Sequence, residues 1–251
     1  MNPDSGSGAA VWALVALIAS LSGCATAPSG GSDAAPVRAE HDPLEPLNRS
    51  LYAINDAVDR VTLKPIARGY KAVVPEFARR GVTNFSRNLF TPRSAVNNFL
   101  QGKPGPGFSE LGRFIINTTL GIGGLIDIAT AQGMPVYDED FGQTLAVWGW
   151  KDSRYLVMPI FGPYTARDFV GRGFYGYFHP VSYAIREHNN YWPLVADLIS
   201  LRAELLPLQA DIDAAADPYL LIRDVYLQNR EFEIYDGDPP APDYDALLEE
   251  Y

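Results

Sequence analysis

The segment Leu111–Ala129, LGRFIINTTLGIGGLIDIA, constrains the fold more than any other part of the sequence. Its 19 residues are almost all apolar, which is long enough for a helix that spans a membrane. However, Arg113 and Asp127 lie near its two ends, and the glycines of the GIGG sequence at 121–124 interrupt a helix midway. We therefore expect two short apolar helices that fold against each other at this GIGG corner.

Two environments fit such a helical hairpin. It can form the buried core of a soluble domain. It can also dip into one leaflet of a membrane or line a cavity, where protein groups pair with the backbone at the corner. The beginning of the chain bears on this choice.

The first residues are typical of a bacterial lipoprotein signal peptide. The apolar run Val11–Leu21 is followed by Ser22, Gly23 and Cys24. A run of this length is too short for a permanent membrane-spanning helix. We therefore predict a signal peptide over residues 1–23 and lipid attachment at Cys24; a buried or free cysteine is the alternative. The residues before the run differ from ordinary signal peptides because they contain no Lys or Arg.

Lipid attachment at Cys24 predicts a protein that is anchored to a membrane. The chain has no second cysteine for an internal disulfide. A single acyl chain binds only marginally, whereas two or more hold a protein firmly. Ala25 takes the place of the Asp that usually retains lipoproteins in the inner membrane, so we expect the outer membrane. Residues 24–41, rich in Ala, Ser, Gly and Pro, predict an acylated flexible tether.

Charge is distributed unevenly along this acidic chain, whose formal net charge is −10. Residues 60–103 contain nine Lys and Arg but only one acid, Glu76. This basic block either meets anionic lipid headgroups or forms a solvated helical face. Nucleic-acid binding is not expected of an exported acidic protein. Residues 235–251 are rich in Pro and acids and predict a disordered tail.

Helical patterns dominate residues 42–234, so we predict one all-α domain there. Its first helix carries an apolar stripe at Leu47, Leu51, Ile54 and Val58 and ends at Pro65. The second begins at Pro75 and is interrupted at Thr91-Pro92. Its predicted inward-facing residues are Phe77, Val82, Phe85 and Leu89. Ser109 is expected to cap the helix that enters the opening segment, after a loop at 102–107. Further helices are predicted at 141–148, 194–216 and 218–232, and an extended segment at 155–160.

Ten aromatic residues lie between Phe161 and Trp192. Tyr and Trp favour the interface of a membrane with water, because one end of each ring is apolar and the other is polar. A protein core or a surface that faces a partner would be aromatic as well.

No catalytic or metal-binding motif stands out. The sequence nearest to a nucleophile elbow, Gly107–Leu111, lacks the final glycine. The GIGG corner resembles a dinucleotide fingerprint only superficially. His179 and His188 lack the spacing of a zinc helix, and Asp138–Asp140 is best explained as the acidic start of a helix. We therefore expect no enzyme, no cofactor and no metal.

Six blocks of the sequence, taken together and in order, resemble the VacJ/MlaA family of outer-membrane lipoproteins. The blocks are DPLEPLNRSLYAIND (42–56), VTNFSRNLFTPRSAVNNFLQG (82–102), GRFIINTTLGIGGLIDIA (112–129), DFGQTLAVWG (140–149), PIFGPYTARD (159–168) and DPYLLIRDVYLQNREF (217–232). They cover most of the chain after Cys24, and the predicted lipid attachment fits the family.

The resemblance implies a ring-shaped helical domain embedded in the inner leaflet of the outer membrane, with an amphipathic channel through it. In that family, phospholipids mislocalised to the outer leaflet pass through the channel to a periplasmic lipid-shuttle protein. Family members also lie against trimeric porins. The hairpin at 111–129 then becomes a wall embedded in the membrane, with Arg113 and Asp127 at headgroup depth or in the channel.

A channel needs no catalytic residue, because polar groups along its wall lower the cost of moving a charged headgroup between leaflets. The resemblance implies gating near Asn55 and Asp56. The candidate headgroup contacts are Arg87, Arg93, Asn97, Asn98, Arg113 and Asp127.

Two other functions remain compatible with the sequence. A lipid-binding scaffold would dock partners at the envelope without passing lipid. A lipid hydrolase would need a nucleophile such as Ser109 beside one of the three histidines.

Overall fold

The computed structural model describes residues 42–178 and 192–240. The chain divides into two units, 1–36 and 37–251, and every described residue belongs to the second. This unit is mostly helical, as predicted. Its longer helices are α3 (Glu45–Val61), α4 (Leu63–Val73), α5 (Glu76–Leu100), α6 (Pro104–Thr119), α9 (Ala166–Phe178), α11 (Trp192–Leu205) and α13 (Pro218–Ile234). The short elements are α7 (Ile128–Ala131), α8 (Phe141–Val147), η1 (Leu206–Leu208), α12 (Gln209–Ala214), β1 (Tyr155–Met158) and β2 (Gly162–Thr165).

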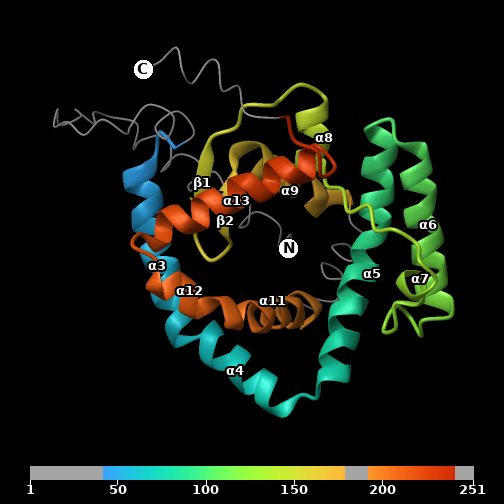
Figure 1. The fold of residues 1–251 in the computed structure, drawn as a ribbon, viewed down its shortest axis with the longest axis horizontal. Coiled ribbons are helices and arrows are strands. Elements are labelled where there is room, and N and C mark those ends of the chain that lie inside the picture. Colours follow the sequence, from blue (N-terminus) through green and yellow to red (C-terminus); the bar gives the residue numbers. More distant parts are fainter. Residues whose placement is uncertain (1–41, 179–191, 241–251) are drawn as a thin grey trace, which may run out of the picture. The chain divides into compact units, whose positions relative to one another are not determined.

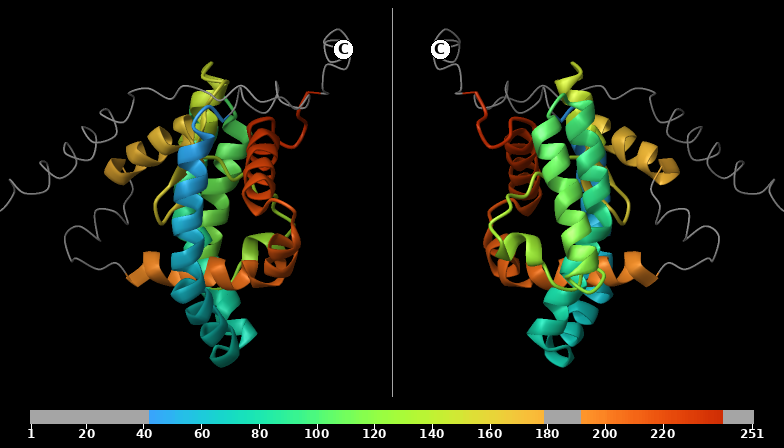
Figure 2. Two further views of the ribbon diagram at one scale, coloured as in Figure 1. Left: turned by 90° about the vertical axis from the view of Figure 1, so that its left-hand side faces the viewer. Right: turned by 90° about the vertical axis from the view of Figure 1, so that its right-hand side faces the viewer.

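Helices α3 and α4 run down one side of this unit, and α5 runs back up the opposite side with α6 beside it (Figure 1). Helix α11 contacts both α4 and α5, so the chain returns inside the angle that these two helices make. Helices α9 and α13 overlap in Figure 1, but Figure 2 shows that α9 extends away from α13. Within the described part of the chain, no helix combines the length and apolarity needed to cross a membrane.

The distribution of side chains is the reverse of that in an ordinary soluble domain. Among the described residues, nine hydrophobic side chains are buried, whereas nineteen polar or charged side chains are buried. Thirty-four large hydrophobic residues of the same segments are exposed. Scattered exposed apolar residues are normal on a protein surface, whereas an interior with more polar than apolar side chains is unusual.

Helix α3 shows this reversal most clearly. Three of the four residues in the stripe predicted from the sequence face outward, with Leu47, Ile54 and Val58 at 46%, 56% and 42% exposure. The fourth, Leu51, is half-buried and packs against the cluster of Tyr155, Val157 and Tyr219. The buried residue of the helix is Asn48, whose amide donates to the carbonyl of Tyr155 at 3.1 Å and accepts from the amide of Val157 at 2.9 Å. The polar side of α3 therefore holds the strand β1.

Two predictions about helix α5 are wrong. It runs without interruption through Pro92, although this proline removes one backbone hydrogen bond. Packing against α6 along its length compensates. Its buried residues are Ser86, Asn88, Ser94, Ala95, Asn97 and Asn98. Of the predicted inward-facing residues, Phe77 is 78% exposed and the other three are only half-buried, so the inward face of α5 is polar.

The predicted GIGG corner is confirmed, but only one of its two helices is long. Helix α6 ends at Thr119, and α7 after the corner has four residues. A Cβ atom at Gly121 would lie 2.2 Å from the carbonyl oxygen of Ile126, so the corner needs glycine there. Gly124 adopts φ of 96°, which also favours glycine. Leu120, Ile122, Leu125 and Ile126 at this corner are all exposed.

Proline explains most of the other boundaries that differ from expectation. Pro65 lies in the first turn of α4 and does not end α3, because the missing N–H has no partner there to lose. Helix α6 begins at Pro104 with Lys103 at its N-cap, so Ser109 is not a cap. Pro207 breaks the predicted helix 194–216 into α11, η1 and α12.

Residues 155–165 form a β-hairpin. The predicted extended segment corresponds to β1, which pairs antiparallel with β2. The sequence did not reveal β2, because its four residues begin with Gly162 and Pro163, which are rare within strands. The helices predicted at 141–148 and 218–232 are confirmed as α8 and α13, with Asp140 and Asp217 as their N-caps.

Candidate functional site

A cavity of about 460 Å³ brings four of the six predicted headgroup residues together. We call this cavity the α5 chamber, since residues of α5 form much of its wall. Arg87 and Arg93 come from α5, Arg113 from α6, and Asp127 from the N-cap of α7. Arg113 and Asp127 therefore lie in one wall of the chamber.

Arg113 is the most constrained cation of the α5 chamber. It is buried, and its Nη1 donates to the carbonyl of Met134 at 2.7 Å. Its Nη2 lies 3.3 Å from Asp127 and donates to the hydroxyl of Thr130 at 2.9 Å. The guanidinium thus fixes the segment after the GIGG corner to α6.

Asp127 balances this charge. Burial opposes its ionisation, but hydrogen bonds from Thr130 and Asn117 and the charge of Arg113 outweigh burial and lower its pKa. Its Oδ1 accepts from the amide of Thr130 at 3.0 Å as the cap of α7. Asn117 donates to the same oxygen at 3.0 Å. Asp127 therefore stays ionised in the chamber wall.

The two arginines of α5 differ in their surroundings. Arg93 lies 3.3 Å from Asp138, and its guanidinium lies 5.4 Å from the ring centre of Phe90. Arg87 is exposed, and no carboxylate of the described residues lies within ion-pair distance of it. Arg87 is therefore the chamber cation with the freest charge toward a ligand.

Asn97 and Asn98 do not line the α5 chamber. Both are fully buried, with 0% exposure. Asn97 accepts from the hydroxyl of Thr144 at 2.8 Å, and Asn98 donates to the carbonyls of Ser94 and Tyr137 at 2.9 and 3.1 Å. In this structure their amides join α5 to its neighbours, and their headgroup role stays a prediction.

The predicted gating residues lie at the β-hairpin, away from the chamber. Asn55 donates to the carbonyl of Met158 at 2.9 Å and accepts from the amide of Ile160 at 2.8 Å. Asp56 pairs with Arg60 at 2.8 Å on the same helix. Asn55 thus holds the turn of the hairpin to α3, and its gating role also stays a prediction.

Several polar residues of the chamber wall were not predicted as site residues, among them Asn88, Glu110 and Asn117. Asn88 donates to the hydroxyl of Thr118 at 2.9 Å, and Glu110 accepts from the amide of Tyr137 at 2.8 Å. The spacing held a signal, because Asn84 and Asn88 on α5, and Arg113 and Asn117 on α6, are four residues apart and share a helix face.

A second charged cluster lies where α8, α9 and α13 meet. Arg230 lies 2.6 Å from Asp140 and 3.0 Å from Asp168. Burial opposes ionisation of Asp168, but the charge and hydrogen bonds of Arg230 and its other partners lower its pKa. The three residues are far apart in the sequence, so spacing gave no sign of this cluster.

Cavities continue from the α5 chamber on both sides along α5. A neighbouring cavity of about 520 Å³, beside the Arg230 cluster, shares Phe90 and Arg93 with the chamber. Another, of about 420 Å³, shares Asn84 and Arg87 with it. Polar residues of one helix therefore line three adjoining cavities.

Several expectations lie outside the described residues. These include Cys24, the tether 24–41, all three histidines and residues 241–251 of the acidic tail. Ser109 lies half-buried on α6. Within the described segments, no group of three or more His, Cys, Asp or Glu is placed to hold a metal ion.

Comparison with known proteins relates most of the chain to one family. The family model described as MlaA lipoprotein matches residues 40–233. The Escherichia coli K12 protein named intermembrane phospholipid transport system lipoprotein MlaA is 34% identical over 227 residues, which cover 87% of this chain and 86% of that protein. An uncharacterized Rickettsia prowazekii protein is 35% identical over 196 residues, 77% of this chain and 78% of its own length.

A solved structure agrees with these matches. It was described as the structural basis for maintenance of bacterial outer membrane lipid asymmetry. Its TM-score is 0.67 at 34% sequence identity, and the match covers 77% of this chain and 98% of that one.

Proposed function

The chain belongs to the MlaA lipoprotein family, and we propose on this basis that it removes mislocalised phospholipids from the outer leaflet of the outer membrane and passes them to a periplasmic carrier. The named relatives of E. coli and Haemophilus influenzae are intermembrane phospholipid transport lipoproteins, at 34% and 33% identity. Coverage of nearly nine-tenths of both chains supports a shared function over the whole domain.

The observation that carries this proposal is the polar α5 chamber inside a domain with an apolar exterior. A headgroup that crosses between leaflets would lose its hydration in the hydrocarbon layer, which is costly. The arginines and amides of the chamber would replace that water, while the acyl chains stay against apolar surface or lipid. This path needs no catalytic residue. Because such a path only speeds equilibration, the downstream acceptor would give the transport its direction.

The exposed apolar residues support embedding in the inner leaflet of the outer membrane. They lie on several elements, among them α3, α5 and the corner between α6 and α7. Since no described helix can cross a bilayer, the domain would lie within one leaflet. Acylation at Cys24 by two or more chains would hold it there.

Family membership also suggests the partners. We expect the domain to lie beside a trimeric porin and to deliver lipid to a periplasmic shuttle protein. The headgroup contacts would be Arg87, Arg93 and Arg113, with Asp127 orienting Arg113. Asn97 and Asn98 would enter this role only if α5 moved relative to α8.

The proposal is tested in a strain that lacks the gene, scored for phospholipid in the outer leaflet. Deletion should raise that phospholipid, and the wild-type gene should restore it. Cys24→Ala should not restore it, whereas the neighbouring control Ser29→Ala should. If deletion leaves outer-leaflet phospholipid unchanged, the transport function is wrong and a lipid-binding scaffold becomes the better account.

A further inference from the structure

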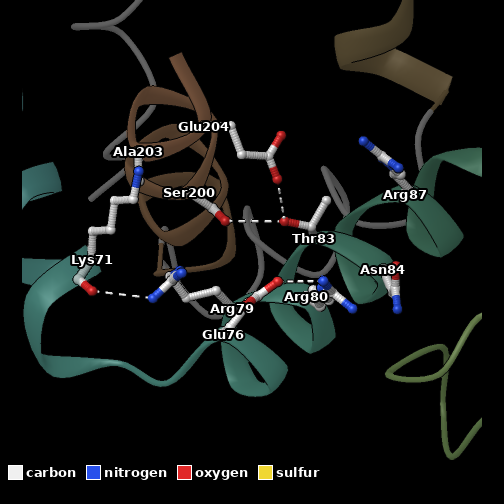
Figure 3. A pocket seen from close by; sticks show the side chains of 10 residues that line it. All are labelled: Lys71, Glu76, Arg79, Arg80, Thr83, Asn84, Arg87, Ser200, Ala203 and Glu204. Carbon is white, nitrogen blue, oxygen red and sulfur yellow. Dashed lines mark hydrogen bonds and ion pairs between the residues drawn. The ribbon is translucent and has the colours of Figure 1, made fainter. Parts of the chain in front are cut away.

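A basic pocket lies at the turn between α4 and α5, where α11 packs against both helices. Figure 3 shows this cavity of about 420 Å³, which we call the basic pocket. Four cations line it: Lys71 from α4 and Arg79, Arg80 and Arg87 from α5. Lys71 and Arg87 stand on opposite sides of the view, with Thr83 between them.

The two acids of the basic pocket leave half of this positive charge uncompensated. Glu76 pairs with Arg80 one helical turn away, and both side chains are largely exposed. Glu204 on α11 accepts a hydrogen bond from the hydroxyl of Thr83 at 2.9 Å. Neither carboxylate is paired with Lys71 or Arg87.

Arg79 is oriented by neutral groups. Its Nη1 donates to the carbonyls of Lys71 and Val74 at 3.1 and 2.6 Å, which lie at the end of α4. These bonds hold the guanidinium in place without neutralising it. A fixed cation that needs no rearrangement on binding is suited to an anion.

Lys71 and Arg87 add two further charges. No carboxylate of the described ranges lies within 4.0 Å of either side chain. Lys71, Arg79 and Arg87 thus line one cavity that an oxyanion can enter, with Lys71 and Arg87 on opposite sides of it (Figure 3). A phosphate group matches such a set, because its oxygens accept several charge-assisted hydrogen bonds at once.

An apolar groove adjoins the basic pocket. This second cavity shares Glu76, Arg80 and Asn84 with the pocket, and Phe77, Leu125 and Ile126 also line it. Phe77 is 78% exposed, and Val73 on the other side of the turn is 81% exposed. Phosphate recognition and apolar surface therefore meet at one place, which favours a ligand that carries both a phosphate and acyl chains over a free phosphate ion.

We propose that the basic pocket and the apolar groove together form a docking site for a glycerophospholipid, with the phosphodiester at Lys71, Arg79 and Arg87 and the acyl chains along Phe77. This inference rests on the proposed transport of phospholipid and adds a defined binding step to it. Arg87 and Asn84 also line the α5 chamber, so a headgroup would pass from one cavity to the next without leaving Arg87.

Binding of purified, full-length protein in neutral detergent tests the docking site. The probes are a diacyl phosphatidylglycerol, the matching diacylglycerol and inorganic phosphate. Loss of one charge-assisted hydrogen bond should weaken phosphatidylglycerol binding about tenfold in Lys71→Gln and in Arg87→Gln. Arg68→Gln is the matched control, since Arg68 is exposed on α4 and does not line the pocket. It should bind as the wild type does.

The other two probes distinguish a phospholipid ligand from a free phosphate ion. Diacylglycerol should bind equally to the wild type and Lys71→Gln, because it has no phosphate. Inorganic phosphate should not displace the lipid at equal concentration; if it does, the pocket is a site for free phosphate and the lipid proposal is wrong. Wild-type affinity in both Lys71→Gln and Arg87→Gln would likewise overturn the proposal.

The outcomes also distinguish the docking site from the transport function. If the wild type binds no phospholipid at all, both fail. If it binds phospholipid with the same affinity after the two substitutions, only the docking site fails. Thermal unfolding shows whether each variant is folded. If Arg87→Gln is unstable, the test rests on Lys71→Gln alone. Lys71 is exposed and has no ion pair among the described residues, so this substitution should not affect folding.

Discussion

Arg113 and Asp127 form an ion pair of 3.3 Å across the GIGG corner, and both side chains line the α5 chamber. The arginine side chain is 6% exposed and the aspartate 30%. Because Arg113 also donates to Met134 and Thr130, it holds three points of the segment after α6. The corner that looked like an apolar hairpin in the sequence is therefore fixed by a charged group.

Removal of Arg113 should destabilise the protein strongly. Arg113→Met leaves Asp127 in the wall without its cation and frees the carbonyl of Met134, so we expect a loss of about 3–5 kcal/mol in the free energy of unfolding. Denaturant unfolding in detergent measures it. Arg154→Gln, at an exposed position, should change stability by about 0.5 kcal/mol or less. A loss in Arg113→Met as small as in this control would contradict the account.

Neighbouring residues on α3 should respond in opposite ways to a change of polarity. Asn48→Leu leaves the amide of Val157 and the carbonyl of Tyr155 without partners, which should cost about 2–5 kcal/mol of stability. Leu47→Asn places a polar group on the exposed face, so it should leave stability nearly unchanged while weakening association with lipid vesicles. Unfolding and vesicle flotation measure the two effects. If Leu47→Asn unfolds the protein instead, the outward orientation of this stripe is wrong.

The contact between α8 and α9 depends on glycine. A Cβ atom at Gly142 would lie 2.4 Å from Oδ1 of Asp168, which is itself held by Arg230. Gly142→Ala should therefore cost about 1–3 kcal/mol through overpacking. Gly173→Ala on α9 meets nothing within 4 Å and should be neutral or slightly stabilising. Equal melting temperatures for the two variants would show that this contact is absent.

Acid should lower the stability of the folded protein partly by protonating Asp168. The pKa of Asp168 lies below its ordinary value of 3.8, so ionised Asp168 stabilises the folded state above that pH. This stabilisation is lost as the pH falls through the lowered pKa. At about pH 6, Asp168→Asn should be less stable than the wild type. Between about pH 6 and about pH 3, however, its free energy of unfolding should fall less than that of the wild type. Denaturant midpoints across this range test the sign, with exposed Asp152→Asn as the control. If the stability of the wild type and that of Asp168→Asn changed in parallel with pH, ionised Asp168 would not stabilise the folded state.

Local patterns predicted the helices well where a single element determines its own ends. Capping by Asp140 and Asp217 and the glycine corner follow from nearest neighbours in the chain. Pro92 does not interrupt α5 as predicted, because packing against α6 outweighs one missing hydrogen bond. Such a long-range effect cannot be read from local sequence.

Which side of a helix faces inward was the harder question. The inward prediction for Phe77 on α5 was wrong, because the buried face of this helix is formed mostly by polar residues. The predicted headgroup residues were only partly brought together, and their role stays a prediction. Arg87, Arg93, Arg113 and Asp127 do lie together, whereas the amides of Asn97 and Asn98 face α8 and the segment before it.

The central claim is that headgroups pass through the α5 chamber. A bulky side chain there should block the path, and Thr91 lines the chamber at a half-buried position. Val96→Trp, at an exposed site on the same helix that is 53% accessible, is the matched control.

The most direct measurement is outer-leaflet phospholipid in a deletion strain that carries either variant at wild-type protein level. The account predicts that Val96→Trp restores low outer-leaflet phospholipid and that Thr91→Trp, although folded and anchored, does not. Full restoration by Thr91→Trp would contradict passage through the chamber and would favour a lipid-binding scaffold.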